Sequence, residues 1–194
     1  MNRIKIIYSY IILMLYIGCT SGRIISDSDR IVTLQQSYNE NNYLTFLQYF
    51  PDTFDSFVNI YGYIENDDDT SFSILYDDAY NHIAYLFEKN DMVEVNVFFE
   101  KIFSITQYSY WQADAYTYLT INIEKLFYNR YDDIIYFLNS RNNKELEEFW
   151  FFMLNGPNPI NNKYSRFIVK LQEEHQERQI KIIEKVIVRI GTDY

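Results

Sequence analysis

Residues 51–62, PDTFDSFVNIYG, contain the signals of one short helix and of both its ends. Pro51 stops the preceding segment, because proline cannot continue a helical hydrogen-bond ladder. Either Asp52 or Thr53 can then cap a helix over 54–61, and the glycine that follows suits its end. Apolar residues of this segment recur at i, i+3, i+4 and i+7, which places them on one face of a helix. The stretch therefore predicts a short amphipathic helix with marked boundaries.

The same periodicity and the composition of the whole chain favour an all-α fold. Only five glycines and three prolines are present, too few for the many turns of an all-β domain. Hydrophobic residues make up 48% of the chain, which is enough for one substantial core. We expect about eight helices, packed as antiparallel hairpins in an irregular bundle or a short solenoid, with a long C-terminal helix. No fixed-period motif is present, so no named repeat family is indicated.

The predicted helices follow one another with short Asn- and Asp-rich connections. They cover 31–49 with a weak break at 39–42, 54–61, 72–89, 92–105, 111–128, 132–138, 144–154 and 163–190. The plainest loop is 65–71, ENDDDTS. The eight polar residues over 172–179 mean that the last helix either leaves the body midway or breaks there. The segments from 92 and over 186–190 could instead be strands, because apolar residues also alternate or run together in them.

The first 22 residues, MNRIKIIYSYIILMLYIGCTSG, are predicted to direct export. Arg3 and Lys5 give a positive start, and a nearly continuous apolar run follows over 6–17. As a helix this run would span roughly 18 Å, short of the ~30 Å hydrocarbon core of a bilayer. That length is typical of a secretory signal peptide. Cys19 is the only cysteine, so no intrachain disulfide can form.

The sequence YIGC at 16–19 resembles the lipobox of bacterial lipoproteins, although Tyr16 stands where that motif usually has leucine. The resemblance implies that 1–18 is a signal peptide and that cleavage leaves Cys19 as the mature N-terminus, carrying acyl chains such as palmitate. Two or more acyl chains give a stable membrane anchor. The alternatives are an uncleaved anchor helix, a signal peptide that leaves Cys19 free, or a buried helix of the fold.

This resemblance also implies a layout for the mature chain. Residues 19–30 contain the lipidated cysteine and a polar tether, and 31–194 form the helical domain. Thr20, where an aspartate would favour the inner membrane, favours the outer membrane of the cell envelope. Separately, 50–63 and 149–159 resemble segments of small uncharacterised all-helical bacterial proteins. That second resemblance implies a helical fold and no particular activity.

The formal charge of −10 is distributed unevenly. Residues 19–162 hold 22 Asp and Glu against eight Lys and Arg, whereas 163–190 hold seven Lys and Arg against four Glu. An acidic body excludes a nucleic-acid partner, because phosphate binding requires a basic footprint. The charge is compatible with a basic protein partner, but much of it would also serve as a solvated surface.

Few residues are candidates for catalysis or metal binding. Asp78 and His82 share a helix face, as a base and its orienting carboxylate or half of a metal site would. No second histidine lies nearby and His82 falls on an apolar stripe, so we interpret it as a core histidine. His175 lies in QEEHQERQ, which is typical of a solvated helix. Asp114 stands among closely packing residues and is either a surface or a partly buried carboxylate.

Other chemistries lack their motifs. The run of aspartates at 67–69 has neither the glycine nor the glutamate that an EF-hand loop requires. No G-x-S-x-G, S-x-x-K or glycine-rich phosphate loop is present. The aromatic residues over 108–118 could line a groove, although most aromatic residues must belong to the core and its boundary. We therefore predict no enzyme activity and no catalytic, cofactor-binding or metal-binding residue.

The expected function is that of a lipid-anchored bacterial envelope protein whose acidic helical body binds another protein. A concrete version is an immunity- or inhibitor-type lipoprotein whose acidic face blocks a basic toxin or enzyme. One alternative is a binding module for a small molecule, glycan or peptide, built on a tyrosine-lined groove. A less favoured alternative is an envelope hydrolase that uses two carboxylates. Cys19 is the single predicted site residue, as the point of lipidation.

Overall fold

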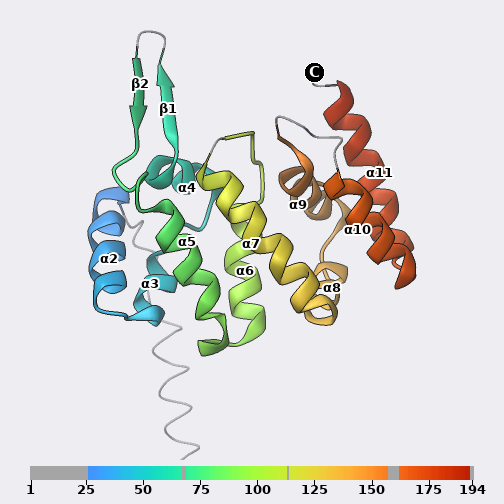
Figure 1. Ribbon diagram of the computed structural model, residues 1–194, viewed down its shortest axis with the longest axis horizontal. Helices are drawn as coiled ribbons and strands as arrows, with labels where there is room; N and C mark the ends of the chain where they lie inside the picture. The colour runs from blue at the N-terminus through green and yellow to red at the C-terminus, as the bar shows by residue number, and fades with distance from the viewer. Residues whose placement is uncertain (1–25, 67–68, 113, 157–161, 193–194) are drawn as a thin grey trace, which may run out of the picture.

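Figure 1 shows the computed structural model, which describes residues 26–66, 69–112, 114–156 and 162–192. The described residues form ten α-helices, one short 3-10 helix and one two-stranded sheet. The helices are α2 (Asp27–Asn39), α3 (Tyr43–Tyr49), α4 (Phe54–Tyr61), α5 (Ala79–Glu88), α6 (Val95–Ile105), α7 (Ala115–Asn129), α8 (Tyr131–Asn139), α9 (Asn143–Leu154), α10 (Asn162–Glu173) and α11 (Glu177–Thr192). The predicted all-α fold is confirmed, with ten helices against about eight expected. The predicted signal peptide and Cys19 lie outside the described residues.

The predicted boundaries of α4 are correct. Thr53, not Asp52, is the N-cap, and its side-chain oxygen accepts a hydrogen bond from the Ser56 N–H at 3.2 Å. The buried face of α4 consists of the periodic apolar residues and one further isoleucine, Phe54, Phe57, Val58, Ile60 and Tyr61. The helix therefore forms where a cap and an apolar stripe coincide.

The weak break predicted at 39–42 is a helix-ending backbone motif between α2 and α3. Asn41 has a φ of 53°, in the left-handed region that asparagine tolerates better than most residues. The Asn41 N–H donates to Tyr38 O at 3.0 Å, and the Asn42 N–H donates to Ser37 O at 2.8 Å. This pair of bonds is the Schellman motif, which satisfies the last carbonyls of α2 and turns the chain into α3.

The C-terminal region repeats this motif, so the predicted single long helix over 163–190 is wrong and the predicted break is right. His175 has a φ of 54°, and its N–H donates to Gln172 O at 3.1 Å. The Gln176 N–H donates to Leu171 O at 2.9 Å. The region is therefore two helices, α10 and α11, and α11 with its 16 residues is the longest described helix. The strand alternatives for this end and for the segment from 92 are also wrong.

The loop predicted at 65–71 is instead a hairpin of β1 (Tyr63–Asn66) and β2 (Asp69–Phe72), with Tyr63 paired to Phe72. The helix expected from Phe72 begins only at Ala79. The reason is competition for backbone partners. After β2, the Ser73 N–H donates to Gly62 O at 3.0 Å and the Leu75 N–H donates to Ile60 O at 3.1 Å. These long-range bonds hold the segment against the end of α4 and prevent local helix formation.

The helices succeed one another as hairpins across the molecule, from α2 at one side to α11 at the other, and the β-hairpin projects from one end (Figure 1). Their inner faces share one hydrophobic core that is rich in aromatic rings. Trp150 and Phe167 are fully buried there, and each lies against Phe127 with ring centroids 6.0 and 5.0 Å apart. The core fixes the relative positions of α5 and α7, which form the groove described below.

The position of Gly62 leaves no room for a side chain, so adding a single methyl group there should change the stability of the protein. Its φ of −84° suits any residue, but a Cβ there would lie 2.7 Å from Val58 O and 2.8 Å from Val58 Cγ1. Gly62→Ala should therefore lower the free energy of unfolding by roughly 1–3 kcal/mol. Gly191→Ala is the matched control, because a Cβ there meets nothing within 4 Å and alanine favours a helix by up to about 1 kcal/mol. Urea unfolding would contradict this reasoning if the two substitutions changed stability in the same direction.

Candidate binding groove

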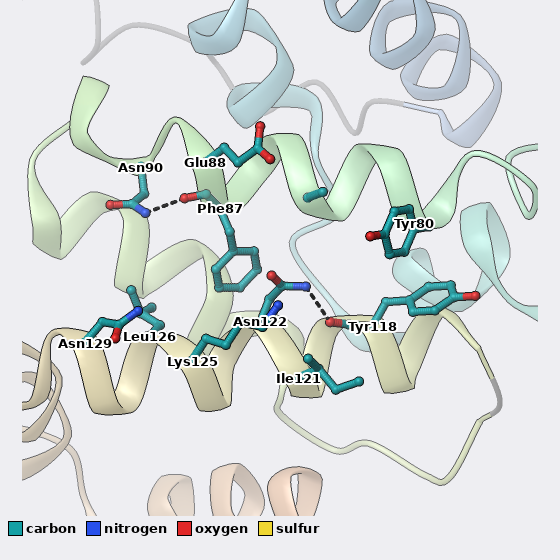
Figure 2. A pocket seen from close by; sticks show the side chains of 11 residues that line it. Tyr80, Phe87, Glu88, Asn90, Tyr118, Ile121, Asn122, Lys125, Leu126 and Asn129 are labelled. Carbon is teal, nitrogen blue, oxygen red and sulfur yellow. Dashed lines mark hydrogen bonds between the residues drawn. The ribbon is translucent and has the colours of Figure 1, made fainter.

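A groove of about 360 Å³ lies between α5 and α7 (Figure 2). Its lining residues recur along each helix at the spacing of one face. From α5 and the turn after it come Tyr80, Ala84, Phe87, Glu88 and Asn90, and from α7 come Tyr118, Ile121, Asn122, Lys125, Leu126 and Asn129. The two helices pack against each other along their length, so the groove is a fixed feature of their outer faces.

One end of the groove is aromatic. Tyr80 and Tyr118 meet edge to face there, with ring centroids 5.3 Å apart and ring planes at 81° (Figure 2). Tyr80 remains 61% exposed despite this contact. Phe87 is buried and lies midway along the groove, between the two helices. The groove thus offers an exposed ring at its mouth and apolar side chains along its floor.

The remainder of the groove is polar. The Asn122 side-chain amide donates to Tyr118 O at 2.8 Å, which leaves the Asn122 side-chain oxygen available as an acceptor. Glu88 and Lys125 are both exposed, and neither has an ion-pair partner among the described residues. Asn129 stands at the far end from the tyrosines (Figure 2). An apolar floor with a few polar groups of both charges is the usual composition of a binding pocket.

An aromatic ridge continues from the tyrosine end of the groove toward the β-hairpin. We define it as Phe72, Tyr76, Tyr80 and Tyr118. The rings of Phe72 and Tyr76 lie 4.5 Å apart, and Phe72 is 63% exposed. The Tyr76 hydroxyl donates to Asp114, the residue that precedes α7. That hydrogen bond, with the negative charge of Asp114, raises the pKa of Tyr76 to about 12.

The sequence pointed to other tyrosines for such a groove. Of the aromatic residues over 108–118, only Tyr118 lines it. Tyr116 is buried, with its hydroxyl donating to Phe152 O and to Asn155 O, and Tyr110 packs on Phe54 with centroids 5.0 Å apart. Tyr108 lies under the Lys144 ammonium, which is 5.4 Å from its ring centroid.

The groove residues that were missed carry a detectable signal. Tyr80, Ala84 and Glu88 are spaced at i, i+4 and i+8, and the α7 residues 118, 122, 125 and 129 follow a similar helical spacing. These positions form a second stripe beside the buried face of each helix. Such a stripe is visible in sequence, but its pairing with a stripe on another helix is not.

His82 is a core histidine, as predicted. It is 1% exposed, its Nδ1 shares a hydrogen bond of 3.0 Å with the Tyr61 hydroxyl, and its ring lies 4.7 Å from that of Tyr38. Burial lowers the pKa of His82 from 6.5 to about 4, although the charge of Asp78 acts in the opposite direction. This histidine is enclosed by aromatic rings and is not among the residues that line the groove.

The other candidate residues also have structural roles. Asp114 is exposed, has a φ of 44° and precedes α7, so it is a surface carboxylate that accepts from Tyr76. His175 is exposed at the break between α10 and α11. Of the aspartates at 67–69, the first two lie outside the described residues and Asp69 is in β2. Within the part of the chain that the structure describes, no group of three or more His, Cys, Asp or Glu side chains could hold a metal ion.

Folding neutralises much of the positive charge of the C-terminal helices. Lys185 and Arg189 of α11 pair with Glu147 and Glu148 of α9 at 2.6 and 3.1 Å. Arg166 of α10 pairs with an acid of α7, Glu124, at 2.7 Å. For these three cations, the separation of charge along the sequence therefore reflects the docking of basic helices on acidic ones.

Comparisons with known proteins leave the function to be argued from the structure. No protein-family model matches the sequence, and neither the curated proteins nor the solved structures include a match. None of the helices within 26–66, 69–112, 114–156 and 162–192 is both long and apolar enough to cross a bilayer.

Proposed function

We propose that this chain is a lipid-anchored bacterial envelope protein whose helical body binds another protein through the α5–α7 groove. The proposal of an anchor rests on the lipobox resemblance at 16–19, and Cys19 is its lipidated residue. The groove carries the proposal of binding, because it has the exposed ring of Tyr80 at one end and the charged side chains of Glu88 and Lys125 further along (Figure 2). The concrete version is an immunity- or inhibitor-type lipoprotein of the outer membrane that blocks a basic toxin or enzyme.

The composition of this surface supports a protein partner. Tyrosine contributes disproportionately to binding energy at protein interfaces, because it buries a large rigid surface at low entropic cost. Exposed charges around an apolar centre are typical of the rim of such an interface. Among the described residues, Glu88 is the only acid that lines the groove, so the groove does not hold the two carboxylates that hydrolysis of a glycan would require.

Cys19→Ser tests the anchor. The substitution removes the thiol that acyl transfer requires, so we expect complete loss of incorporation of radiolabelled palmitate. The body should then move from the membrane fraction to the soluble fraction, because it loses the acyl chains that hold it. Thr20→Ser is the control and should remain labelled and membrane-bound. Retention of the Cys19→Ser protein in membranes after a salt wash would contradict lipid anchoring and favour an uncleaved helix.

Tyr80→Ala tests the groove. We expect the mature chain, immobilised and exposed to solubilised envelope, to retain a specific partner that the variant loses by about tenfold or more. Tyr136→Ala is the matched control, because Tyr136 is a 78% exposed tyrosine on α8 that does not line the groove. Equal capture by both variants would exclude the groove as the binding site.

The polar half of the groove favours a second candidate function, binding of a small molecule, glycan or peptide. The side chains of Asn122 and Asn129 can donate to and accept from hydroxyl groups, while Tyr80 and Tyr118 offer ring surfaces. A screen by thermal unfolding distinguishes this candidate, because a ligand at about 100 times its Kd stabilises a protein by about 2.7 kcal/mol. A hit that stabilises the wild type but not Tyr80→Ala would favour this candidate.

A further inference from the structure

The aromatic ridge and the α5–α7 groove form one continuous surface. Phe72 contacts Tyr76, Tyr76 donates to Asp114, and Asp114 precedes the helix that presents Tyr118. Tyr118 in turn contacts Tyr80 at the mouth of the groove. A partner segment that enters the groove can therefore extend along the ridge toward the hairpin without crossing a gap in contacts.

The charges beside this surface are mostly negative. Asp77 and Asp114 stand at the ridge, and Glu88 stands at the groove. Of the residues that the structure describes, Lys125 is the one cation that lines the groove. None of Asp77, Asp114 and Glu88 has an ion-pair partner among the described residues, so these carboxylates can accept further hydrogen bonds.

Several cations of the body do not offset this charge, because they are already engaged elsewhere. Four that the structure describes each pair with an acid away from the ridge: Arg30, Lys101, Arg130 and Arg141. Asp77, Asp114 and Glu88 therefore receive no counter-charge from these four cations. A negative surface attracts cationic segments and raises their rate of association.

The groove itself suits one apolar side chain. Its floor contains Ala84, Phe87 and Leu126, and the groove measures about 360 Å³. Interface energy concentrates where an aromatic or aliphatic anchor enters such a pocket and polar contacts surround it. The ring of Tyr80, exposed at the mouth of the groove, offers an anchor an aromatic contact there.

From this combination we infer the chemistry of the partner: a cationic peptide segment that places one aliphatic or aromatic anchor in the α5–α7 groove and its lysines or arginines along Asp77, Asp114 and Glu88. The inference rests on the proposed function and specifies the partner of that same site. Lys125 lies on the α7 wall, so a carbonyl or a carboxylate of the partner is favoured on that side of the groove and a cation on the α5 side, at Glu88.

Selection from a phage-displayed library of random 12-residue peptides tests the inference. The bait is the chain from residue 19 onward with Cys19→Ser, so that no lipid is attached. We expect the enriched peptides to combine several Lys or Arg with one Leu, Phe or Trp. Binding of the synthesised peptides, measured by fluorescence anisotropy, should weaken about tenfold or more with Tyr80→Ala. It should weaken about five- to tenfold with Asp77→Asn combined with Glu88→Gln, and further as salt rises.

Two matched controls accompany these variants. Tyr136→Ala removes an exposed tyrosine elsewhere, and Glu173→Gln with Glu184→Gln removes two exposed acids from α10 and α11, so both should bind the peptides like the wild type. Enrichment of neutral or acidic peptides that still require Tyr80 would overturn the cationic partner and leave the groove as a binding site. Peptides indifferent to Tyr80→Ala, or no enrichment at all, would overturn both proposals.

Discussion

Replacing Asp52 with asparagine should lower the free energy of unfolding by about 3 kcal/mol, the low end of the range for breaking a buried ion pair. Asp52 is the only acid that pairs with Arg30 and Lys101 among the described residues. The side chains of those two cations are only 9% and 13% exposed, so each would be left largely desolvated without a counter-charge. The half-exposed position of Asp52 keeps the expected effect below the upper end of the range.

Backbone hydrogen bonds hold the Arg30 and Lys101 side chains in this buried position. Arg30 Nη1 donates to Tyr49 O and Phe50 O, both at 3.0 Å, and Lys101 Nζ donates to Phe50 O at 2.9 Å. These carbonyls are at the C-terminal end of α3, where the helix dipole favours positive charge. Burial lowers the pKa of Lys101, while Asp52 acts to raise it. Arg30 Nε has no hydrogen-bond partner among the described residues, which adds to the need for the carboxylate.

Urea unfolding at pH 7 measures the effect of Asp52→Asn. Glu184→Gln is the control, because it neutralises an exposed acid of α11 that pairs with no described cation, and should change stability by less than about 0.5 kcal/mol. Adding Lys101→Met to Asp52→Asn should recover part of the loss, since one of the two uncompensated charges is then absent. A loss for Asp52→Asn no greater than that of Glu184→Gln would refute the structural role of this cluster.

Acidification from pH 7 to pH 5 should cost the protein roughly 2 kcal/mol of stability through His82 alone. Burial holds the pKa of His82 at about 4, against 6.5 for the ordinary side chain. The unfolded chain therefore takes up a proton at a higher pH than the folded chain. The contribution is fully present above pH 6.5 and is lost progressively as the pH falls toward 4.

The environment of His82 stabilises the neutral imidazole and gives little support to the protonated form. The Tyr61 hydroxyl can donate to the neutral ring at 3.0 Å, and burial raises the pKa of Tyr61 well above 10, which keeps that donor in place. Aromatic rings of Tyr38, Phe46 and Tyr61 surround the imidazole at 4.7, 5.4 and 5.8 Å. A charged imidazolium would be desolvated there with only Asp78 acting in its favour.

The comparison of wild type with His82→Leu isolates this contribution. Leucine forfeits the bond to Tyr61 and lowers stability at every pH, so the informative quantity is the difference in unfolding free energy between pH 7 and pH 5. That difference should shrink by roughly 2 kcal/mol in the variant. If both proteins lost the same stability between these pH values, the titration of His82 would not be its cause.

Local signals in the sequence predicted much of the helical architecture. Thr53 with its apolar stripe identified α4, and the asparagines at 39–42 identified the break before α3. Both features depend on residues within about two helical turns of each other. The hairpin of β1 and β2 was missed because the segment after β2 forms backbone hydrogen bonds with Gly62 and Ile60 at the end of α4. No local sequence pattern indicates hydrogen-bond partners so far away in the chain.

The groove was beyond sequence reasoning for a related reason. Tyr80 and Tyr118 are 38 positions apart, and each alone is an ordinary half-exposed tyrosine on a helix. Only the packing of α5 on α7 makes them one site. The same holds for the charges of 163–190, whose pairing with α7 and α9 could not be read from their excess of lysine and arginine.

The packing of α11 against α9 implies that the chain completes its fold only after its last helix has been synthesised. Trp150 Nε1 donates to Gln179 Oε1 at 2.9 Å, and the Gln179 amide donates to Asn139 Oδ1 at 2.9 Å. The indole N–H of Trp150 therefore lacks its folded-state partner until the chain has been synthesised beyond position 179. A nascent or truncated chain that lacks α11 exposes the apolar face of α9, so the last helix acts as the closing step that protects the body from aggregation.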